Sequence, residues 1–423
     1  MNKVELMAPA GSYEALQAAI NAGCDSIYFG ITQLNMRAKA ANNFTLEDLK
    51  KIAGICHENK VKAYLTMNTL LYDHDINLMK VILKAVKESH IDSIIAADIA
   101  TIQYAREIGV TVHISVQLSV SNIQTVKFWS QFAEIIVLAR ELDMKMVKQI
   151  CDDIIEQDIR GPSGELMRIE VFAHGAMCVA VSGRCGMSLF TDNSSANRGA
   201  CKQNCRKKYI ITDEETGDEL LVDNQFVMSP KDMCTIDFLD KLTDTGVTVL
   251  KIEGRGRPAD YVDAVISSYR EAIDSLEDGT YSREKVKVWM ERLKTIYNRG
   301  LSDGYYMGKK TREWSGSDTN LAKEEKVFLG IVSNYFQKIK VAELELQAFD
   351  LQKGDRLLFT GEKTGVVRTV VEELRNDDRE IVDKILRKNV ATIKVEQNIR
   401  KRDKVYIVRE RKLPEMSQTS ACS

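Results

Sequence analysis

The feature that most constrains the fold is a regular alternation of short β-rich runs with amphipathic helical stretches over the first 275 residues. Helical patterns separate the runs, and the first opens with Ser12 as an N-cap and ends before Gly23. Strands alternating with helical crossovers predict an α/β fold, and eight of them favour a (β/α)8, TIM-like barrel. A doubly wound open sheet is the alternative. The eight predicted strands cover residues 4–8, 26–29, 62–67, 93–97, 111–116, 134–138, 169–173 and 248–252.

The pattern changes near residue 321. Runs of alternating apolar and polar residues, separated by turn residues, predict a small C-terminal antiparallel β-barrel over 321–412. The preceding 1–320 form the barrel domain with a cysteine-rich insertion at about 174–234, and we expect 413–423 to be a flexible tail. A chain of 423 residues with 44% apolar residues can bury two such cores.

Charge and hydropathy exclude several classes of protein. The formal net charge of −2 predicts no general affinity for nucleic acid or membranes, and no apolar run approaches the ~20 residues of a membrane span. The N-terminal residues lack an apolar signal region, so we expect a cytoplasmic protein with reduced thiols. Residues 323–412 hold 21 Lys/Arg against 16 Asp/Glu, a surplus that permits contact with RNA but is equally typical of a solvated surface.

Polar residues gather directly after the predicted strands. In a (β/α)8 barrel these positions form the C-terminal rim, where active sites lie. Polar residues follow most buried strands, so each one alone is weak evidence, whereas the ring together predicts a site. The ring comprises Asn68, Asp98, Gln117, Ser119, Arg140, Glu141, His174, Glu253 and Arg255.

Five cysteines cluster after the seventh predicted strand, at 178, 185, 201, 205 and 234. Four thiolates complete the coordination of an iron–sulfur cluster, so the segment predicts a metal site with one thiol to spare. Zinc is the alternative metal, although neither Cys178 to Cys185 nor Cys201 to Cys205 has the Cys-x-x-Cys spacing of zinc ribbons. Burial as small apolar residues would explain Cys24, Cys56 and Cys151 better than these five.

The same segment is basic. A cationic loop beside a metal centre suits an anionic substrate, either a carboxylate metabolite or a phosphate backbone, and a solvated charged face is the alternative. The acidic residue of this loop is Asp192, and its basic residues are Arg184, Arg198, Lys202, Arg206, Lys207 and Lys208.

Four stretches resemble peptidase family U-32, the collagenase-like proteins. The longest is EVFAHGAMCVAVSGRCGMS at 170–188. The others are LMAPAG at 6–11, the run from NRGAC at 197–201 to Cys205 and Arg206, and SPKDMC at 229–234 leading to KIEGR at 251–255. The cysteine-containing signature is specific, whereas Ala-Pro-Ala-Gly alone is weak. The resemblance covers about residues 4–275, and the family's β-barrel extension is expected over most of the rest.

The resemblance implies two different activities. One is collagen degradation. The other is hydroxylation, which in members of the family acts on the tRNA wobble uridine with prephenate as cosubstrate, on ribosomal RNA cytidine, or on ubiquinone. In the hydroxylases it implies a 4Fe–4S cluster on residues matching Cys178, Cys185, Cys201 and Cys234, with Cys205 as the alternative fourth ligand. Because the ubiquinone members work in pairs, a cluster-bearing partner of a paralogous subunit is a third possibility.

The residue inventory favours the hydroxylase. Neither the His-Glu-x-x-His motif nor the Gly-x-Ser-x-Gly motif occurs, and of five histidines only His174 lies beside the cysteines. Mainly from the resemblance, we expect an iron–sulfur-dependent tRNA uridine hydroxylase with tRNA as partner, and the resemblance alone implies prephenate as its cosubstrate. The expected catalytic residues are His174, Glu253, Arg140 and Glu141, and the expected cosubstrate-binding residues are Arg184, Arg255, Asn68 and Gln117.

Overall fold

The computed structural model describes residues 4–39, 43–207, 209, 211–212, 214–217, 219–220, 228–308, 314–315 and 320–411. The expected tail at 413–423 and Lys208 of the basic loop lie outside this part of the chain.

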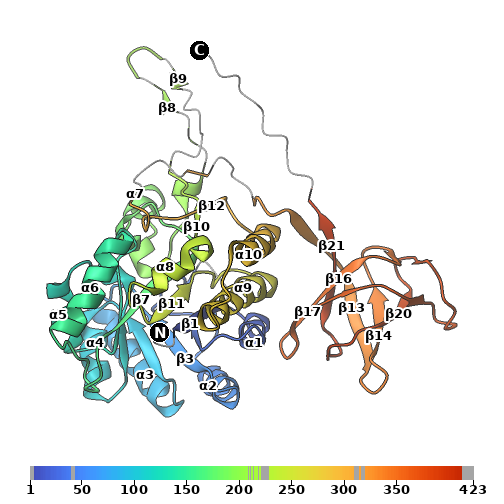
Figure 1. Cartoon of the computed structure of the whole chain (residues 1–423), viewed down its shortest axis with the longest axis horizontal. Coiled ribbons are helices and arrows are strands. Elements are labelled where there is room, and N and C mark those ends of the chain that lie inside the picture. Colours follow the sequence, from blue (N-terminus) through green and yellow to red (C-terminus); the bar gives the residue numbers. More distant parts are fainter. Residues whose placement is uncertain are drawn as a thin grey trace.

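Eight parallel strands close into a barrel (Figure 1). Each strand pairs with the next along the chain, and the last, β11, pairs with both β1 and β7. Closure excludes the doubly wound sheet and confirms the predicted TIM-like barrel; all eight predicted runs form its strands. The strands are β1 (Glu5–Ala10), β2 (Ser26–Phe29), β3 (Lys62–Met67), β4 (Ser93–Ala96), β5 (Val112–Ile114), β6 (Ile135–Val137), β7 (Arg168–Ala176) and β11 (Val249–Ile252).

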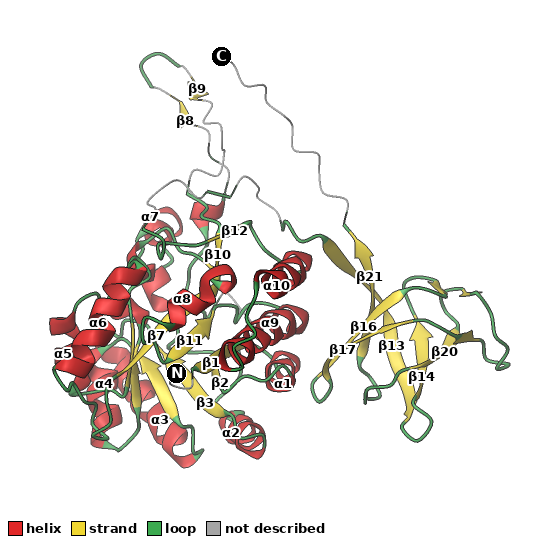
Figure 2. Cartoon of the chain, in the orientation of Figure 1, coloured by secondary structure: helices red, strands yellow, loops and turns green. Residues whose placement is uncertain are grey.

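Helices follow the strands and cover the outside of the barrel (Figure 2). The predicted cap at Ser12 is present, since its hydroxyl accepts a hydrogen bond from the Ala15 amide at 3.2 Å. Asp98, from the predicted rim, caps α4 (Ile99–Glu107) by accepting a hydrogen bond from the Ala100 amide at 2.9 Å. The helices are α1 (Tyr13–Asn21), α2 (Leu49–Glu58), α3 (Ile76–Glu88), α4 (Ile99–Glu107), α5 (Ile123–Ser130), α6 (Met144–Glu156), α8 (Leu239–Thr243), α9 (Ala259–Glu277) and α10 (Arg283–Thr295).

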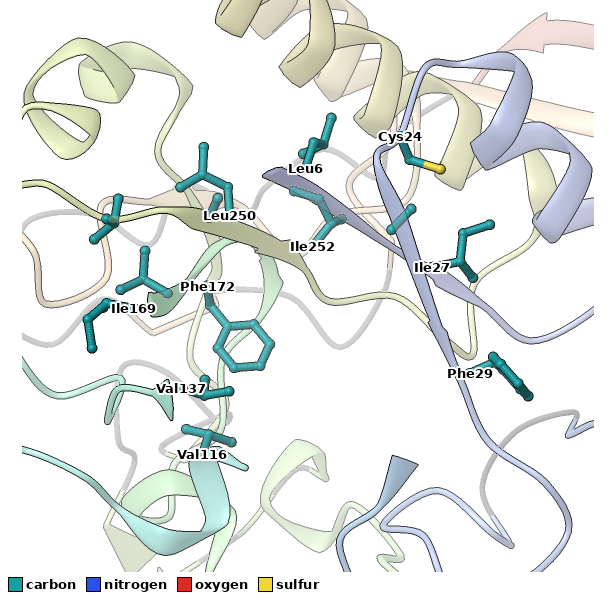
Figure 3. Packing of buried hydrophobic residues seen from close by; sticks show 14 of the residues in the cluster. Leu6, Cys24, Ile27, Phe29, Val116, Val137, Ile169, Phe172, Leu250 and Ile252 are labelled. Atoms are coloured by element: carbon teal, nitrogen blue, oxygen red, sulfur yellow. The ribbon is translucent and has the colours of Figure 1, made fainter. Parts of the chain in front are cut away.

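Strand alternation divides the buried residues into two layers. Outward-facing side chains such as Leu6, Ile27 and Ile252 pack between the strands and the helices (Figure 3). Inward-facing side chains form a separate small cluster that includes Tyr64 and Val249. The interior also carries charge, which a barrel core tolerates only when it is paired.

Two ion-pair groups lie inside the barrel. Glu5 pairs with Arg168 at 2.8 Å and with Lys62 at 3.3 Å near the N-terminal end. Higher in the barrel, Lys251 pairs with Glu170 at 2.7 Å, and both side chains are almost completely buried. This second pair lies just below the C-terminal rim.

An insertion separates β7 from β11 and covers part of that rim. Its strand β10 (Asp232–Cys234) runs antiparallel to the end of β7 and pairs with β12 (Leu301–Ser302). Its other elements are η3 (Val181–Gly183), α7 (Met187–Asp192), η4 (Ala196–Arg198), η5 (Asn204–Arg206), β8 (Ile211–Thr212), β9 (Glu219–Leu220) and η6 (Ile236–Phe238).

The predicted antiparallel β structure follows from residue 324. Seven strands pair in the order β17-β16-β21-β13-β14-β20-β18 around a core of their own. They are β13 (Glu324–Phe336), β14 (Val341–Leu346), β16 (Arg356–Gly361), β17 (Gly365–Val370), β18 (Leu374–Arg375), β20 (Val390–Lys394) and β21 (Lys404–Glu410), with β15 (Leu351–Gln352) and β19 (Lys384–Ile385) as a separate pair.

This C-terminal β domain is docked on α1 and α9 (Figure 1). Lys326 and Arg368 form ion pairs with Asp260 and Asp263 of α9. Gly365, with φ +68°, approaches α1 so closely that a Cβ atom there would lie 2.9 Å from the amide nitrogen of Ala18. Any larger residue at 365 would therefore push the two domains apart.

None of the helices in the described residues combines the length and the apolar character that crossing a membrane requires.

Candidate active site

A cavity of about 270 Å³ opens at the C-terminal ends of the barrel strands. Its walls come from residues that follow β2, β3, β5, β6, β7 and β11, and from the insertion. This is the face at which (β/α)8 barrels carry their sites. The predicted rim residues Asn68, Gln117, Arg140, Glu253 and Arg255 line it.

Four cysteines line the same cavity: Cys178, Cys185, Cys201 and Cys205. Backbone amides donate to two of the sulfurs, from Met187 to Cys185 Sγ at 3.3 Å and from Gln203 to Cys201 Sγ at 3.4 Å. Burial raises the pKa of the Cys205 thiol, the other three thiols raise it further, and Arg206 opposes them. The sequence segment thus folds so that four thiols share one electrostatic environment.

Cys234 lies elsewhere. It belongs to β10, opposite His174 of β7, and its sulfur is 3.9 Å from the Tyr269 hydroxyl and 3.8 Å from the sulfur of Met290. The cavity lining does not include it, and burial raises its thiol pKa to about 11. Among the described cysteines, the four that share the cavity therefore include Cys205, the alternative, in place of Cys234.

The donor set of the cavity is suited to a thiolate-ligated group. Four sulfurs with amide donors nearby match the ligands and hydrogen bonds that iron–sulfur clusters use. No group of three or more His, Cys, Asp or Glu side chains in the described residues is arranged to hold a single metal ion. The four thiols nevertheless line one cavity, and the charges of Cys178, Cys185 and Cys201 act on Cys205.

A cluster of charged side chains centred on Glu253 lines the same cavity. Arg37 donates to Glu253 Oε1 at 3.1 Å, and the Tyr28 hydroxyl lies 3.2 Å from Oε2. Burial raises the pKa of Glu253, but Arg37, Arg140 and Arg255 together outweigh burial and hold the pKa below its ordinary value. Glu253 is therefore ionised at neutral pH.

Arg255 is fixed and desolvated. Its guanidinium donates to Thr66 Oγ1 at 2.6 Å and to Asn35 Oδ1 at 2.8 Å, two neutral acceptors. Burial lowers its pKa to about 10, so it stays protonated at neutral pH. Gly30 makes room for it, because a Cβ atom there would lie 2.0 Å from Nη1 of Arg255.

Arg140 carries a charge that no carboxylate within ion-pair distance balances in the described residues. Its Nη1 donates to the Ala176 carbonyl at 3.0 Å, and its guanidinium lies 3.7 Å above the Phe172 ring. Its Nε is buried without a hydrogen-bond partner. Such a group is a ready anion partner.

The cavity is strongly cationic. Glu253 is the one carboxylate that contributes to the described lining, against seven basic side chains. The basic side chains are Arg37, Arg140, Arg206, Lys251, Arg255, Arg257 and Arg299. Counting Glu170, which pairs with Lys251, and Asp232, which lies 3.6 Å from Arg299, still leaves a surplus of positive charge. A low-dielectric cavity of this kind favours a compact anion with more than one negative charge.

His174, the predicted acid/base residue, is not among the residues that line the cavity. A register shift pairs Lys251 with Phe172 and Ile252 with His174, so Ala173 is bulged. His174 thereby turns outward with Ile252, and its ring packs against Tyr261 and Tyr269 at centroid distances of 6.2 and 5.7 Å. Burial lowers its pKa to about 3, so it is a neutral packing residue.

Two further predicted residues lie beside the cavity without lining it. Glu141 accepts hydrogen bonds from the amide and hydroxyl of Ser182, at 2.7 and 3.1 Å, and so anchors the turn after Cys178. Arg184 is exposed and donates to the Gln117 carbonyl at 2.8 Å. Both side chains thus form hydrogen bonds between the barrel and the cysteine segment, and neither lines the cavity.

Sequence reasoning missed several cavity residues. Arg37 lies in the loop after β2, far from any strand end, so no positional signal marks it. Lys251 and Tyr28 are interior strand positions whose alternation with Leu250 and Ile27 could have placed them inside the barrel. Arg299 lies two residues before β12, a two-residue strand with no sequence signature.

The fold and the cavity together define a (β/α)8-barrel protein with a cationic, thiol-lined site. The chain matches the sequence profile of peptidase family U32 over residues 11–316 and belongs to that family. A collagenase of Porphyromonas gingivalis is 49% identical over 406 residues, covering 96% of this chain and 98% of that protein.

Other relatives carry names from RNA modification. The tRNA hydroxylation protein P1 of Bacillus subtilis is 31% identical over 388 residues, covering 90% of this chain and 89% of that protein. The 23S rRNA 5-hydroxycytidine synthase of Escherichia coli is 28% identical over 317 residues, covering 73% of this chain and 46% of that protein. The family thus includes members named for proteolysis and members named for hydroxylation of RNA.

Proposed function

We propose that this protein is an RNA-hydroxylating enzyme that acts on the wobble uridine of tRNA, with a 4Fe–4S cluster and prephenate as cosubstrate. The single observation that carries the proposal is the cavity itself, which combines four thiols with an excess of arginines at the active face of the barrel. Hydrolysis of a peptide has no use for four clustered thiols, whereas a redox centre does.

The cluster ligands in this proposal are Cys178, Cys185, Cys201 and Cys205. Four thiols are the usual ligand set of a 4Fe–4S cluster, and neither Cys178 to Cys185 nor Cys201 to Cys205 has the Cys-x-x-Cys spacing of a zinc ribbon. When bound, the cluster would supply one-electron redox chemistry. The residues of the chain bind and orient the substrates around it.

The cosubstrate site in this proposal lies between Arg140 and Arg255. Prephenate is a small dicarboxylate, and the two guanidiniums are charged, positioned and without carboxylate partners within ion-pair distance in the described residues. Arg–carboxylate contacts are strong because they are charge-assisted and geometrically matched. Asn68 and Gln117, on the neighbouring wall, offer neutral donors and acceptors that fix orientation.

Glu253 is the residue placed to hold or accept a proton. Its carboxylate is ionised, is held by Arg37 and lies at the cavity wall next to Arg255. A carboxylate kept ionised by neighbouring arginines is a weak base, so its main effect is to orient Arg37 and the Tyr28 hydroxyl.

Spectroscopy of two cysteine variants tests the cluster ligands. Anaerobically purified protein is expected to be brown, to contain about four irons and to lose the visible absorbance in Cys205→Ser. The matched variant Cys234→Ser is expected to keep the colour and the iron. The reverse result would assign the fourth ligand to Cys234, and colourless protein with bound zinc after anaerobic reconstitution would refute the cluster.

Mass spectrometry of tRNA nucleosides tests the activity. Deleting the gene is expected to remove the hydroxylated wobble uridine, and the Arg140→Gln gene is expected not to restore it. Unchanged nucleosides in the deletion strain would refute the function while leaving the spectroscopic result intact.

The second candidate function is proteolysis of collagen, which the name of the 49% identical relative favours. The variant Cys201→Ser separates the two candidates. A cluster-dependent hydroxylase loses activity, whereas digestion of denatured collagen by an unrelated site would persist. Retained proteolysis at the wild-type rate would support the peptidase.

A further inference from the structure

A second cavity, of about 310 Å³, lies between the barrel and the C-terminal β domain, and we refer to it as the interdomain cavity. The barrel contributes the start of α1 and residues 255–259, which lead into α9. The β domain contributes the side chains of Lys326, Thr360, Lys404 and Tyr406. Neither domain forms this cavity alone.

The interdomain cavity has an excess of positive charge. Lys404 is exposed, and no carboxylate of the described residues lies within ion-pair distance of it. Arg257 rests on the ring of Tyr297, 3.6 Å from its centroid, rather than on an acid. Lys326 is paired with Asp260, and Glu14 is the one carboxylate in the described lining. Lys404 and Arg257 are thus the cations available to an anion.

Helix geometry adds to this charge. Both α1 and α9 begin at the cavity, so the positive ends of a 9-residue and a 19-residue helix face it. Ser12 caps α1, whereas Pro258 gives α9 no side-chain cap. Peptide groups in the first turn of α9 can therefore serve a bound anion in addition to the two cations.

The two cavities share a wall. Arg255, Gly256 and Arg257 line both the thiol-lined cavity and the interdomain cavity. An elongated polyanion that crosses this short loop would reach both at once. A free small anion would have no such reason to occupy adjoining cavities.

We propose that the interdomain cavity binds a backbone phosphate of the RNA whose nucleotide enters the thiol-lined cavity. Lys404 of the C-terminal β domain then contacts the phosphate, and residues 255–257 lie between the bound phosphate and the base; we call this arrangement the phosphate clamp. The ion pairs of Lys326 and Arg368 with α9 fix the distance between clamp and cavity. This inference rests on the proposed action on RNA and adds where the RNA backbone is held.

Binding of unmodified tRNA to the anaerobically purified, full-length protein tests the clamp, with Lys404→Glu compared with Lys353→Glu. Lys353 is exposed on the same domain and lines neither cavity. The Lys353→Glu variant therefore makes the same change of charge at a position outside the proposed site. Lys404→Glu is expected to weaken binding roughly tenfold, the size of a charge-assisted contact. The slope of log K against log salt should fall by about 1, while Lys353→Glu leaves both unchanged.

Several outcomes would overturn the clamp. Equal effects of the two variants would show only general electrostatics, and an unchanged salt slope in Lys404→Glu would remove the phosphate contact. Inorganic phosphate that stabilises the wild type but not Lys404→Glu, with equal tRNA affinity in both, would assign the site to a small anion. Wild-type hydroxylation of tRNA with no effect of Lys404→Glu would refute the clamp alone, since the proposed function would stand.

Discussion

Breaking the Lys251–Glu170 pair is expected to destabilise the barrel more than any surface ion pair can. Lys251 Nζ donates to Glu170 Oε1 at 2.7 Å, and the two side chains are 5% and 0% exposed. The second carboxylate oxygen, Oε2, is buried without a hydrogen-bond partner. The variant Lys251→Met would leave a buried carboxylate with neither counter-charge nor donor. Removing one partner of a buried pair costs about 3–5 kcal/mol, which for a barrel of this size corresponds to a drop in melting temperature of roughly 5 °C.

The loss should depend on pH in a defined direction. Burial raises the pKa of Glu170 even with Lys251 present, and Lys251 is the main group that lowers it. In Lys251→Met the pKa rises further, so the folded state binds a proton that the unfolded chain releases. The stability that the variant loses relative to the wild type is therefore smallest at acid pH and grows as the pH rises through the raised pKa of Glu170.

Thermal and urea unfolding across a pH series provide the measurement, with two controls. The double variant Lys251→Met/Glu170→Gln removes the stranded charge and should recover most of the lost stability. Lys148→Met breaks an exposed pair with Asp152 on α6 and should leave the melting temperature unchanged. A single variant as stable as Lys148→Met, or a double variant no better than the single one, would refute the reasoning.

Three further results are expected. His174→Phe keeps the packing against its neighbouring tyrosines and should retain tRNA hydroxylation; loss of activity with an unchanged melting temperature would restore His174 to the mechanism. Gly30→Ala should raise KM for the carboxylate cosubstrate more than it lowers kcat, because the new Cβ would collide with Arg255; an unchanged KM would contradict this. Burial lowers the pKa of both His113 and His174 to about 3, whereas histidines of the unfolded chain have a pKa of about 6.5. Between these two values the unfolded chain binds more protons than the folded protein, so the free energy of unfolding should fall as the pH drops from about 6.5 towards 3. In the double variant His113→Phe/His174→Phe the free energy of unfolding should depend less on pH than in the wild type, and an equal dependence in both proteins would contradict this.

The barrel was predictable from the sequence because its strands are short, apolar and separated by capped helices. Hydrophobic periodicity reports on which face of an element is buried, and all eight strands carry it. The charged interior was harder to predict. Glu170 and Lys251 occupy positions that alternation assigns to the inside, yet nothing in either strand shows that the other will be its partner.

The site was predictable in composition but not in geometry. Proximity in sequence grouped Cys234 with the other cysteines, whereas β10 directs its sulfur toward Tyr269 and Met290. His174 follows the seventh strand in the pattern of a rim residue, whereas the bulge at Ala173 reverses its direction. In both places a short strand or a bulge changes the direction of a side chain without altering the residue pattern.

The position of His174 also bears on the peptidase interpretation of the family name. A cysteine peptidase needs one thiol activated by an imidazole within hydrogen-bond reach. Cys178 is exposed at the cavity, but the bulge places the ring of His174 on the far side of the strand, against α9, where it stays neutral. The arginines share the cavity with the four thiols, and none of the described residues that line it is a histidine, so no imidazole is placed there to activate a thiol nucleophile. If collagen is degraded by this chain, the cleavage must use groups other than a Cys178–His174 pair, which is why a thiol variant distinguishes the two activities.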